Sequence, residues 1–219
     1  MPGRIGAAAA IIGPVVLLVA TMLHPMSADP NDPVAAFSEY AADRLWIASH
    51  FAQFVGVCLI FIGLCALSRS LEGERTRWPS DLALLTAATT LAAAAILQAV
   101  DGVALKAMVD RWAAAPDTQK PVAFAAALAV RHVEIGVAGF SAVLFGMTGV
   151  LFGVALVASQ KYPVGLGWLA IVGGAGTTAG GVLTVFTGFS PAEMNVAMPS
   201  NLVLLGWLVA TGVIMWRRG

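Results

Sequence analysis

The chain has 219 residues, of which 59% are hydrophobic and 11% are charged, and its mean hydropathy is +0.86. A soluble domain would carry about a quarter charged residues, so the composition excludes water as the medium around most of the surface. Twelve Lys and Arg balance twelve Asp and Glu without a basic block, which excludes nucleic acid as a partner and leaves the lipid bilayer.

Six apolar stretches are each long enough to cross about 30 Å of hydrocarbon as a helix. Because a backbone in lipid must satisfy its own hydrogen bonds, we expect an all-α polytopic membrane protein, folded as one six-helix transmembrane domain over residues 1–219. The predicted helices run approximately over residues 5–23, 45–67, 82–109, 133–158, 164–189 and 202–216. The fourth is expected to continue outward to Pro121, and the sixth could start a few residues earlier.

The first stretch is longer than the core of a typical signal peptide, so we expect it to stay as an uncleaved anchor. The segment 29–33, which reads DPNDP, marks the loop that follows it. Loops between the other stretches are also short and contain turn residues such as Pro116 and Pro191. No loop is long enough to form a separate domain.

The basic residues predict the orientation of the chain in the membrane. With both termini in the cytoplasm, seven basic residues lie inside and five lie outside, and the inner loops are very short. The seven are Arg4, Arg69, Arg75, Arg77, Lys161, Arg217 and Arg218, and the five are Arg44, Lys106, Arg111, Lys120 and Arg131. We therefore expect a multi-pass protein of the plasma membrane with both termini cytoplasmic.

Three histidines are expected at nearly the same depth of the bundle. His24 ends the first apolar stretch, His50 lies about a turn and a half into the second, and His132 begins the fourth. Asp101 and Glu134 belong close to the same level. Ionisable side chains are costly inside a membrane and commonly mark functional sites, so this level of the bundle is the candidate site.

Helix geometry groups these side chains further. His50 and Gln53 are three residues apart, as are Gln98 and Asp101, so each pair shares a helix face. His132 and Glu134, by contrast, are about 200° apart on an ideal helix and cannot both point into one cavity. The preferred interpretation is binding of a small molecule, or proton-linked binding, in the outer half of the membrane. The candidate ligand-binding residues are His50, Gln53, Gln98, Asp101, His132 and Glu134.

Two other interpretations use the same residues. In one, His24, His50 and His132 ligate a metal ion or a haem, which would make the chain a membrane redox protein. In the other, the polar side chains only hold helices together, as in a structural subunit of a membrane complex. The sequence contains no HExxH, CxxC or paired-carboxylate motif, so the catalytic residues, the cofactor and the question of enzymatic activity stay unknown.

Glycines at a spacing of four predict close helix packing. Gly149 and Gly153 form one GxxxG motif, and Gly176 and Gly180 form another. Such faces let two helices approach closely in lipid. They predict packing inside the chain, and they are also the candidate faces for a helix–helix oligomer.

The chain resembles a bacterial family of six-helix integral membrane proteins known as a domain of unknown function. The resemblance covers nearly the whole chain, and its motifs are packing and interface patterns. It is carried by the segments 23–25 (LHP), 101–102 (DG), 111–116 (RWAAAP), 162–169 (YPVGLGWL), 173–181, 187–190 (TGFS), 205–207 (LGW) and 216–218 (WRR), with Trp46 and His50. The resemblance implies a six-helix fold and supplies no catalytic residues.

Overall fold

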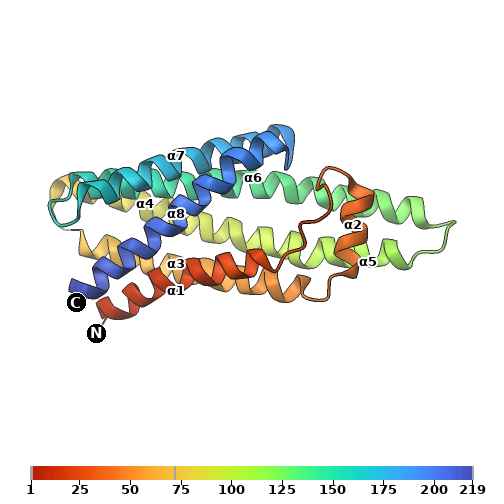
Figure 1. The fold of residues 1–219 in the computed structure, drawn as a ribbon, viewed down its shortest axis with the longest axis horizontal. Helices are drawn as coiled ribbons and strands as arrows, with labels where there is room; N and C mark the ends of the chain where they lie inside the picture. Colours follow the sequence, from red (N-terminus) through yellow and green to blue (C-terminus); the bar gives the residue numbers. More distant parts are fainter. Residues whose placement is uncertain (1, 72, 219) are drawn as a thin grey trace.

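The computed structural model describes residues 2–71 and 73–218, and the regular structure of these residues is helical, without a strand. The elements in chain order are α1 (Pro2–Met22), α2 (Pro33–Ala42), α3 (Trp46–Ser70), α4 (Glu74–Leu97), the π-helix η1 (Gln98–Leu105), α5 (Lys106–Ala114), α6 (Lys120–Ala158), α7 (Val164–Thr187) and α8 (Pro191–Arg218). Figure 1 shows the long helices side by side, with both chain ends at the same end of the bundle.

Among the described residues, six helical segments are long and apolar enough to cross a membrane, which confirms the predicted all-α architecture. They are α1, α3, the continuous segment α4–η1–α5, α6, α7 and α8. Large apolar side chains cover the outside of the bundle, such as Phe186 at 81% and Val122 at 75% exposed. An apolar exterior of this extent is what lipid, and not water, stabilises.

Three of the spans extend well beyond their predicted bounds, by more than the few residues seen at the ends of α1 and α3. The third runs from Glu74 to Ala114, the fourth begins at Lys120, and the sixth begins at Pro191. The fourth span includes the expected outward extension to Pro121. These extensions are polar or amphipathic, so a hydropathy pattern stops where the apolar stretch stops, whereas the hydrogen-bonded backbone continues into the interface. Ser190 caps the sixth span by accepting a hydrogen bond from Glu193 N at 3.2 Å.

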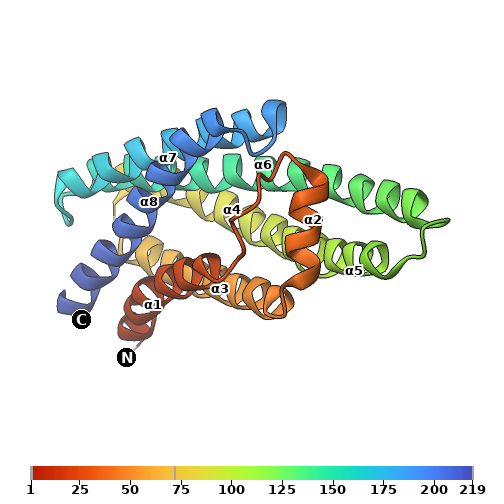
Figure 2. The ribbon, with the colours of Figure 1, turned by 45° about the vertical axis from the view of Figure 1, so that its right-hand side comes forward.

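The helix α2 is a finding that the sequence analysis missed, because the whole segment between the first two spans was expected to be a loop. Asp32 caps it, and its Oδ1 accepts hydrogen bonds from the N–H groups of Val34 and Ala35. Pro33 occupies the first helical position, where its missing N–H costs nothing. Figures 1 and 2 show α2 lying across the bundle away from the termini, with α5 and the start of α6 extending past it.

The end of the bundle that holds the two termini is called the terminal end here, and the opposite end is called the α2 end. Each end has its own apolar core. Buried side chains of the core at the terminal end include Leu67, Phe152, Leu156, Trp207 and Leu208. The core at the α2 end comprises Ala36, Phe37, Tyr40, Trp46, Leu105, Val109, Trp112 and Ala127. The core at the α2 end holds α2 against α5 and α6. It covers the predicted level of ionisable side chains on the side of the α2 end.

Glycines bring neighbouring spans to backbone contact. A Cβ atom at Gly13 of α1 would lie 2.7 Å from the main-chain N of Ile60 in α3. A Cβ atom at Gly146 of α6 would lie 2.5 Å from the carbonyl oxygen of Gly174 in α7. Both distances are too short for any side chain, so these helices pack closely because the positions are glycine.

The two GxxxG faces also contact helices of the same chain. Gly149 and Gly153 of α6 face α7, and Gly149 also faces α8. Gly176 and Gly180 of α7 face Ser200 and Ala197 of α8, respectively. The four glycines therefore serve packing within one chain, and an oligomer built through them stays a prediction.

Candidate functional site

His50 and Asp101 join α3 to η1 through a buried contact. Nε2 of His50 lies 3.0 Å from Oδ2 of Asp101, and Nδ1 of His50 lies 2.6 Å from the carbonyl oxygen of Trp46. The two side chains are 3% and 14% exposed. A carbonyl oxygen only accepts, so Nδ1 carries a hydrogen. The other contact then requires one further proton, which either Nε2 or the carboxyl group holds.

Asp101 is positioned by an interruption of the α-helix. The turns of η1 are π-helical, and such local widening is frequent at functional sites. Nε1 of Trp46 donates a hydrogen bond to the main-chain oxygen of Asp101 at 3.0 Å. This bond fixes the backbone of η1 against the beginning of α3. Oδ1 of Asp101 is buried and has no hydrogen-bond partner among the described residues.

His24 approaches the same contact from the loop after α1. Its Nδ1 lies 2.9 Å from the carbonyl oxygen of Pro25, and its ring centroid lies 5.1 Å from that of His50. The ring also packs against Trp46, with centroids 4.5 Å apart. One potential ligand atom from each of His24, His50 and Asp101 lies within 4.8 Å of the other two. Burial lowers the pKa of His24, which favours its neutral imidazole.

Arg131 and Glu134 form a separate ion pair on α6. Nη1 of Arg131 lies 2.7 Å from Oε2 of Glu134, and the side chains are only 7% and 3% exposed. The guanidinium group also lies over the rings of Tyr40 and Phe189, at 5.6 and 4.9 Å from their centroids. Its Nη2 lies 3.4 Å from the carbonyl oxygen of Pro30. The pair thus connects α6 to α2 and to the turn that precedes α8.

The structure separates the six candidate ligand-binding residues into three groups and one outlier. His50 contacts Asp101, and one turn closer to the terminal end Nε2 of Gln98 donates to Oε1 of Gln53 at 3.2 Å. Glu134 is buried with Arg131, while His132 is exposed, with its Nδ1 2.8 Å from the carbonyl oxygen of Leu128. The different directions of His132 and Glu134 agree with their predicted angular separation.

The three histidines therefore do not converge. His24 and His50 lie together, whereas His132 faces away on the surface of α6, and Asp101 takes the third position of the group. The sequence alone could not predict that Asp101, and not His132, lies beside His24 and His50. The place of His24 is set by a loop that has no helical periodicity. Haem ligation by the histidines stays a prediction.

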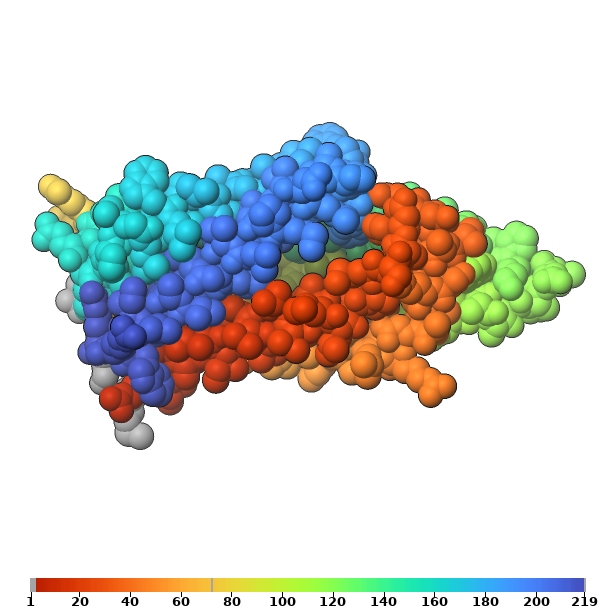
Figure 3. All heavy atoms as spheres, in the orientation of Figure 1, coloured from red at the N-terminus to blue at the C-terminus, as the bar shows by residue number. Residues whose placement is uncertain are grey.

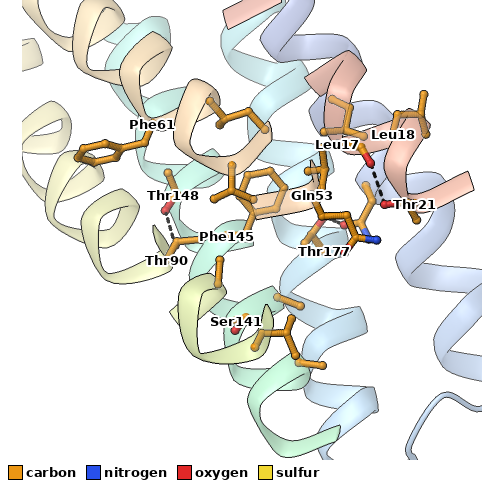
Figure 4. Close-up of a pocket in the computed structure, with 18 of the residues that line it drawn as sticks. Leu17, Leu18, Thr21, Gln53, Phe61, Thr90, Ser141, Phe145, Thr148 and Thr177 are labelled. Carbon is orange, nitrogen blue, oxygen red and sulfur yellow. Dashed lines mark hydrogen bonds between the residues drawn. The ribbon is translucent and has the colours of Figure 1, made fainter. Parts of the chain in front are cut away.

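A cavity of about 380 Å³ lies in the middle of the bundle, with residues from all six spans around it. This volume is within the usual range of about 300 to 1,000 Å³ for small-molecule sites. Most of the lining is apolar. Figure 4 shows the labelled side chains around the cavity, including Leu17 and Thr21 of α1, Gln53 of α3, Phe145 of α6 and Thr177 of α7.

The cavity opens to the side, between α1 and α8. Near the termini these helices touch, because a Cβ atom at Gly212 would lie 2.9 Å from the carbonyl oxygen of Ala7. Towards the α2 end they diverge, and Figure 3 shows a hollow between α8 and α1 with deeper atoms visible in it. Leu18 of α1 and Leu202 of α8 line the cavity and are exposed, at 36% and 54%. The opening therefore lies on the face that lipid would cover.

The polar groups of the cavity are uncharged. Among its described lining residues, the polar side chains are those of Thr21, Gln53, Thr90, Gln98, Ser141, Thr148, Thr177 and Asn201. Most of them bond to one another or to the backbone, as Thr177 does to Oδ1 of Asn201 at 2.9 Å. Two buried oxygens, Oε1 of Gln98 and Oγ of Ser141, have no hydrogen-bond partner among the described residues. Sequence reasoning found Gln53 and Gln98 but missed Ser141, Thr177 and Asn201, which carry no motif.

Gln98 also lines a smaller pocket of about 200 Å³, whose other lining residues come from α3 and from the α4–η1 segment. His50 and Gly102 border this pocket, together with Phe51, whose side chain is 67% exposed. The glutamine thus lies between the central cavity and the polar contact of His50 with Asp101. It is the residue that connects the two parts of the candidate site.

The sequence model of one protein family, described as Domain of unknown function (DUF4386), matches residues 5–212. The matched segment contains every residue of the cavity and of the polar groups described above. No curated protein and no solved structure matches the chain. The family description carries no activity.

Proposed function

The chain belongs to the family described as Domain of unknown function (DUF4386), and we propose that it is a plasma-membrane protein that binds a neutral, lipid-like small molecule in its central cavity. The observation that carries this proposal is the lateral opening of an apolar cavity with two buried oxygens, Oε1 of Gln98 and Oγ of Ser141, that have no hydrogen-bond partner within the described part of the chain. A ligand that enters from lipid needs an apolar body, and its polar group must supply the missing hydrogen bonds.

The chemistry of the ligand follows from the lining. None of the described residues that line the cavity carries a charge, so a charged headgroup would be buried there without a partner at high cost. A hydroxyl group can donate to Oε1 of Gln98 and accept from Oγ of Ser141, since a hydroxyl does both. We therefore assign the ligand to the class of neutral amphiphiles with a hydroxyl headgroup and one flexible apolar chain.

The proposal retains Gln53 and Gln98 of the predicted site and extends the site towards the middle of the membrane.

The orientation of the chain in the membrane is part of the proposal. Seven basic residues at the terminal end against five at the α2 end support cytoplasmic termini. The His50–Asp101 contact then lies towards the outer surface, one turn from the amide groups that bind the ligand.

The test is native mass spectrometry of the full chain in lipid nanodiscs, with monoolein as the neutral probe and oleate as a charged control. We expect monoolein, but not oleate, to stay bound. Ala138→Trp fills the cavity and should abolish retention, whereas Ala129→Trp on the exposed side of the same helix should not change it. Equal retention in Ala138→Trp and Ala129→Trp would overturn the proposal.

A second variant tests the polar contact. Gln98→Leu removes the unpartnered acceptor while keeping an apolar side chain of similar length, and it should weaken monoolein binding by about tenfold, the effect of losing roughly 1 to 1.5 kcal/mol. A Gln98→Leu protein that binds monoolein as tightly as the unmodified chain would show that the headgroup does not lie at Gln98.

A further inference from the structure

We propose that His24, His50 and Asp101 form a binding site for a divalent transition-metal ion, and that Zn²⁺ is the ion this site fits best. The three side chains come from the loop after α1, from α3 and from η1. One potential ligand atom of each lies within 4.8 Å of the other two. The proposal goes beyond the ligand cavity, since none of the three residues lines it.

The hydrogen bonds of the two imidazoles leave the same ring nitrogen available on both. Nδ1 of His24 contacts the carbonyl oxygen of Pro25 at 2.9 Å, and Nδ1 of His50 contacts that of Trp46 at 2.6 Å. Each Nδ1 therefore carries the hydrogen, and the lone pair of a neutral ring is on Nε2. Metal-binding histidines in proteins are held in this way, with the other ring nitrogen donating to a carbonyl or a carboxylate.

Asp101 is the third ligand of the group, and its carboxylate has an oxygen that makes no hydrogen bond to the described residues. Its Oδ2 lies 3.0 Å from Nε2 of His50, and its Oδ1 is buried without a hydrogen-bond partner among the described residues. Two tetrahedral ligands at about 2.0 to 2.1 Å from Zn²⁺ are about 3.3 Å apart. The separation of these two atoms is thus within a few tenths of an ångström of one edge of the tetrahedron that a bound ion requires.

The donor set selects the kind of ion. Two imidazole nitrogens and one carboxylate oxygen suit Zn²⁺, and three protein ligands leave the fourth tetrahedral position for water or another ligand. Mg²⁺ and Ca²⁺ prefer oxygen ligands only, so they fit this group poorly. The ion would replace the proton that Nε2 of His50 and the carboxyl group now share, so its binding releases a proton.

The surroundings hold the three ligands in place while leaving one side accessible. Trp46 packs against the rings of both histidines, at centroid distances of 4.5 and 4.7 Å, and its Nε1 bonds to the main chain of Asp101. The ring of Tyr40 covers Trp46 at 4.4 Å. His24, on the loop, is only partly buried, so an ion can reach the group from the side that carries this loop.

The test is zinc binding by the full chain, purified without a histidine tag and treated with chelator. Isothermal titration should show one Zn²⁺ per chain at micromolar protein concentration, and Co²⁺ should give the visible absorption of a tetrahedral complex. His24→Gln should weaken Zn²⁺ binding by at least about 100-fold, because losing a ligand exceeds the 10- to 100-fold effect of losing an outer contact. His132→Gln, which changes an exposed histidine of the same chain, should leave the affinity unchanged.

A second measurement separates metal binding from folding. His24→Gln should unfold at the same temperature as the unmodified chain without metal, and only the unmodified chain should become more stable when Zn²⁺ is added. Absence of stoichiometric binding by the unmodified chain, or equal affinity in His24→Gln and the unmodified chain, would overturn the metal site. Neither result bears on the cavity, which Ala138→Trp tests separately with monoolein.

Discussion

His50 lies directly against Gly102, and this contact requires that residue 102 has no side chain. A Cβ atom at Gly102 would be 2.6 Å from Cβ of His50 and 3.0 Å from its Cγ. Gly102 follows Asp101 in η1, so the glycine that admits the imidazole is adjacent to the carboxylate that binds it. The close packing of α3 against η1 and the contact of His50 with Asp101 therefore depend on each other.

We expect Gly102→Ala to push His50 away from Asp101 and to lower the free energy of unfolding by about 1 to 3 kcal/mol, the usual cost of overpacking. Gly136→Ala is the matched control, because no atom of the described residues lies within 4 Å of a Cβ atom there, and alanine should stabilise that helix by up to about 1 kcal/mol. Thermal unfolding of both variants in the same detergent measures the difference. Equal melting temperatures would mean that η1 moves freely away from α3.

The bilayer explains which features the sequence could predict. Hydropathy alone places six spans, and the angle between His132 and Glu134 correctly separates an exposed from a buried side chain. His24 could not be assigned in this way. Its position depends on the loop that Glu39 holds through Ser27 and Ala28, and such contacts leave no periodic pattern.

Two further misses have different causes. The signal for α2 was present in the sequence as Asp32 followed by Pro33, an N-cap and a favoured first residue, but the proline-rich context indicated a loop. Ser141, in contrast, has no signal at all, since a serine on an alanine-rich helix face usually bonds to its own backbone. Only the structure shows that its hydroxyl group lines the cavity and finds no hydrogen-bond partner among the residues described.

Removing only one partner of the buried Arg131–Glu134 ion pair on α6 should lower the stability of the protein strongly. Arg131→Met leaves the carboxylate of Glu134 buried without its partner, and we expect a loss of about 3 to 5 kcal/mol of stability. Adding Glu134→Gln removes the charge and should restore much of this loss. Arg77→Met provides the control, since its partner Asp81 is 4.0 Å away and both are exposed, so about 0.5 kcal/mol or less is expected.

Unfolding in detergent, followed by circular dichroism, gives the three free energies. The outcome that contradicts this account is a double variant as unstable as Arg131→Met. The contacts of Arg131 with Tyr40 and Phe189 would then matter more than its charge.

Acid should release the loop that carries His24. Partial burial raises the pKa of Glu39, but hydrogen bonds from the N–H groups of Ala28 and Ser27 outweigh this and leave the pKa below its ordinary value of 4.5. A lowered pKa in the folded state means that the stabilisation is complete above pH 4.5 and is lost as the pH falls through the lower, folded-state pKa.

Hydrogen exchange at the amides of Ser27 and Ala28 measures this release. Relative to intrinsic rates, protection should fall as the pH drops below 4.5. Glu39→Gln should lower protection at neutral pH and should match the unmodified chain once acid has protonated Glu39. Glu74→Gln, at an exposed glutamate near the other end of the bundle, should behave like the unmodified chain. Protection that stays constant between neutral and acidic pH would show that other contacts hold the loop.

The threading and its orientation can be tested together by thiol labelling. The two native thiols are first removed by Cys58→Ala and Cys65→Ala. Single cysteines are then introduced into this background. Arg75→Cys and Lys161→Cys lie at the terminal end, and Asp117→Cys lies between α5 and α6 beyond the α2 end. With cytoplasmic termini, a membrane-impermeant maleimide should label only Asp117→Cys in intact cells, and the other two only after permeabilisation. The reverse pattern would keep the six spans but invert the orientation, which would turn the His24 site towards the cytoplasm. Labelling of Arg75→Cys and Lys161→Cys from opposite sides would contradict the fold itself, because an even number of spans separates these positions from each other in the structure.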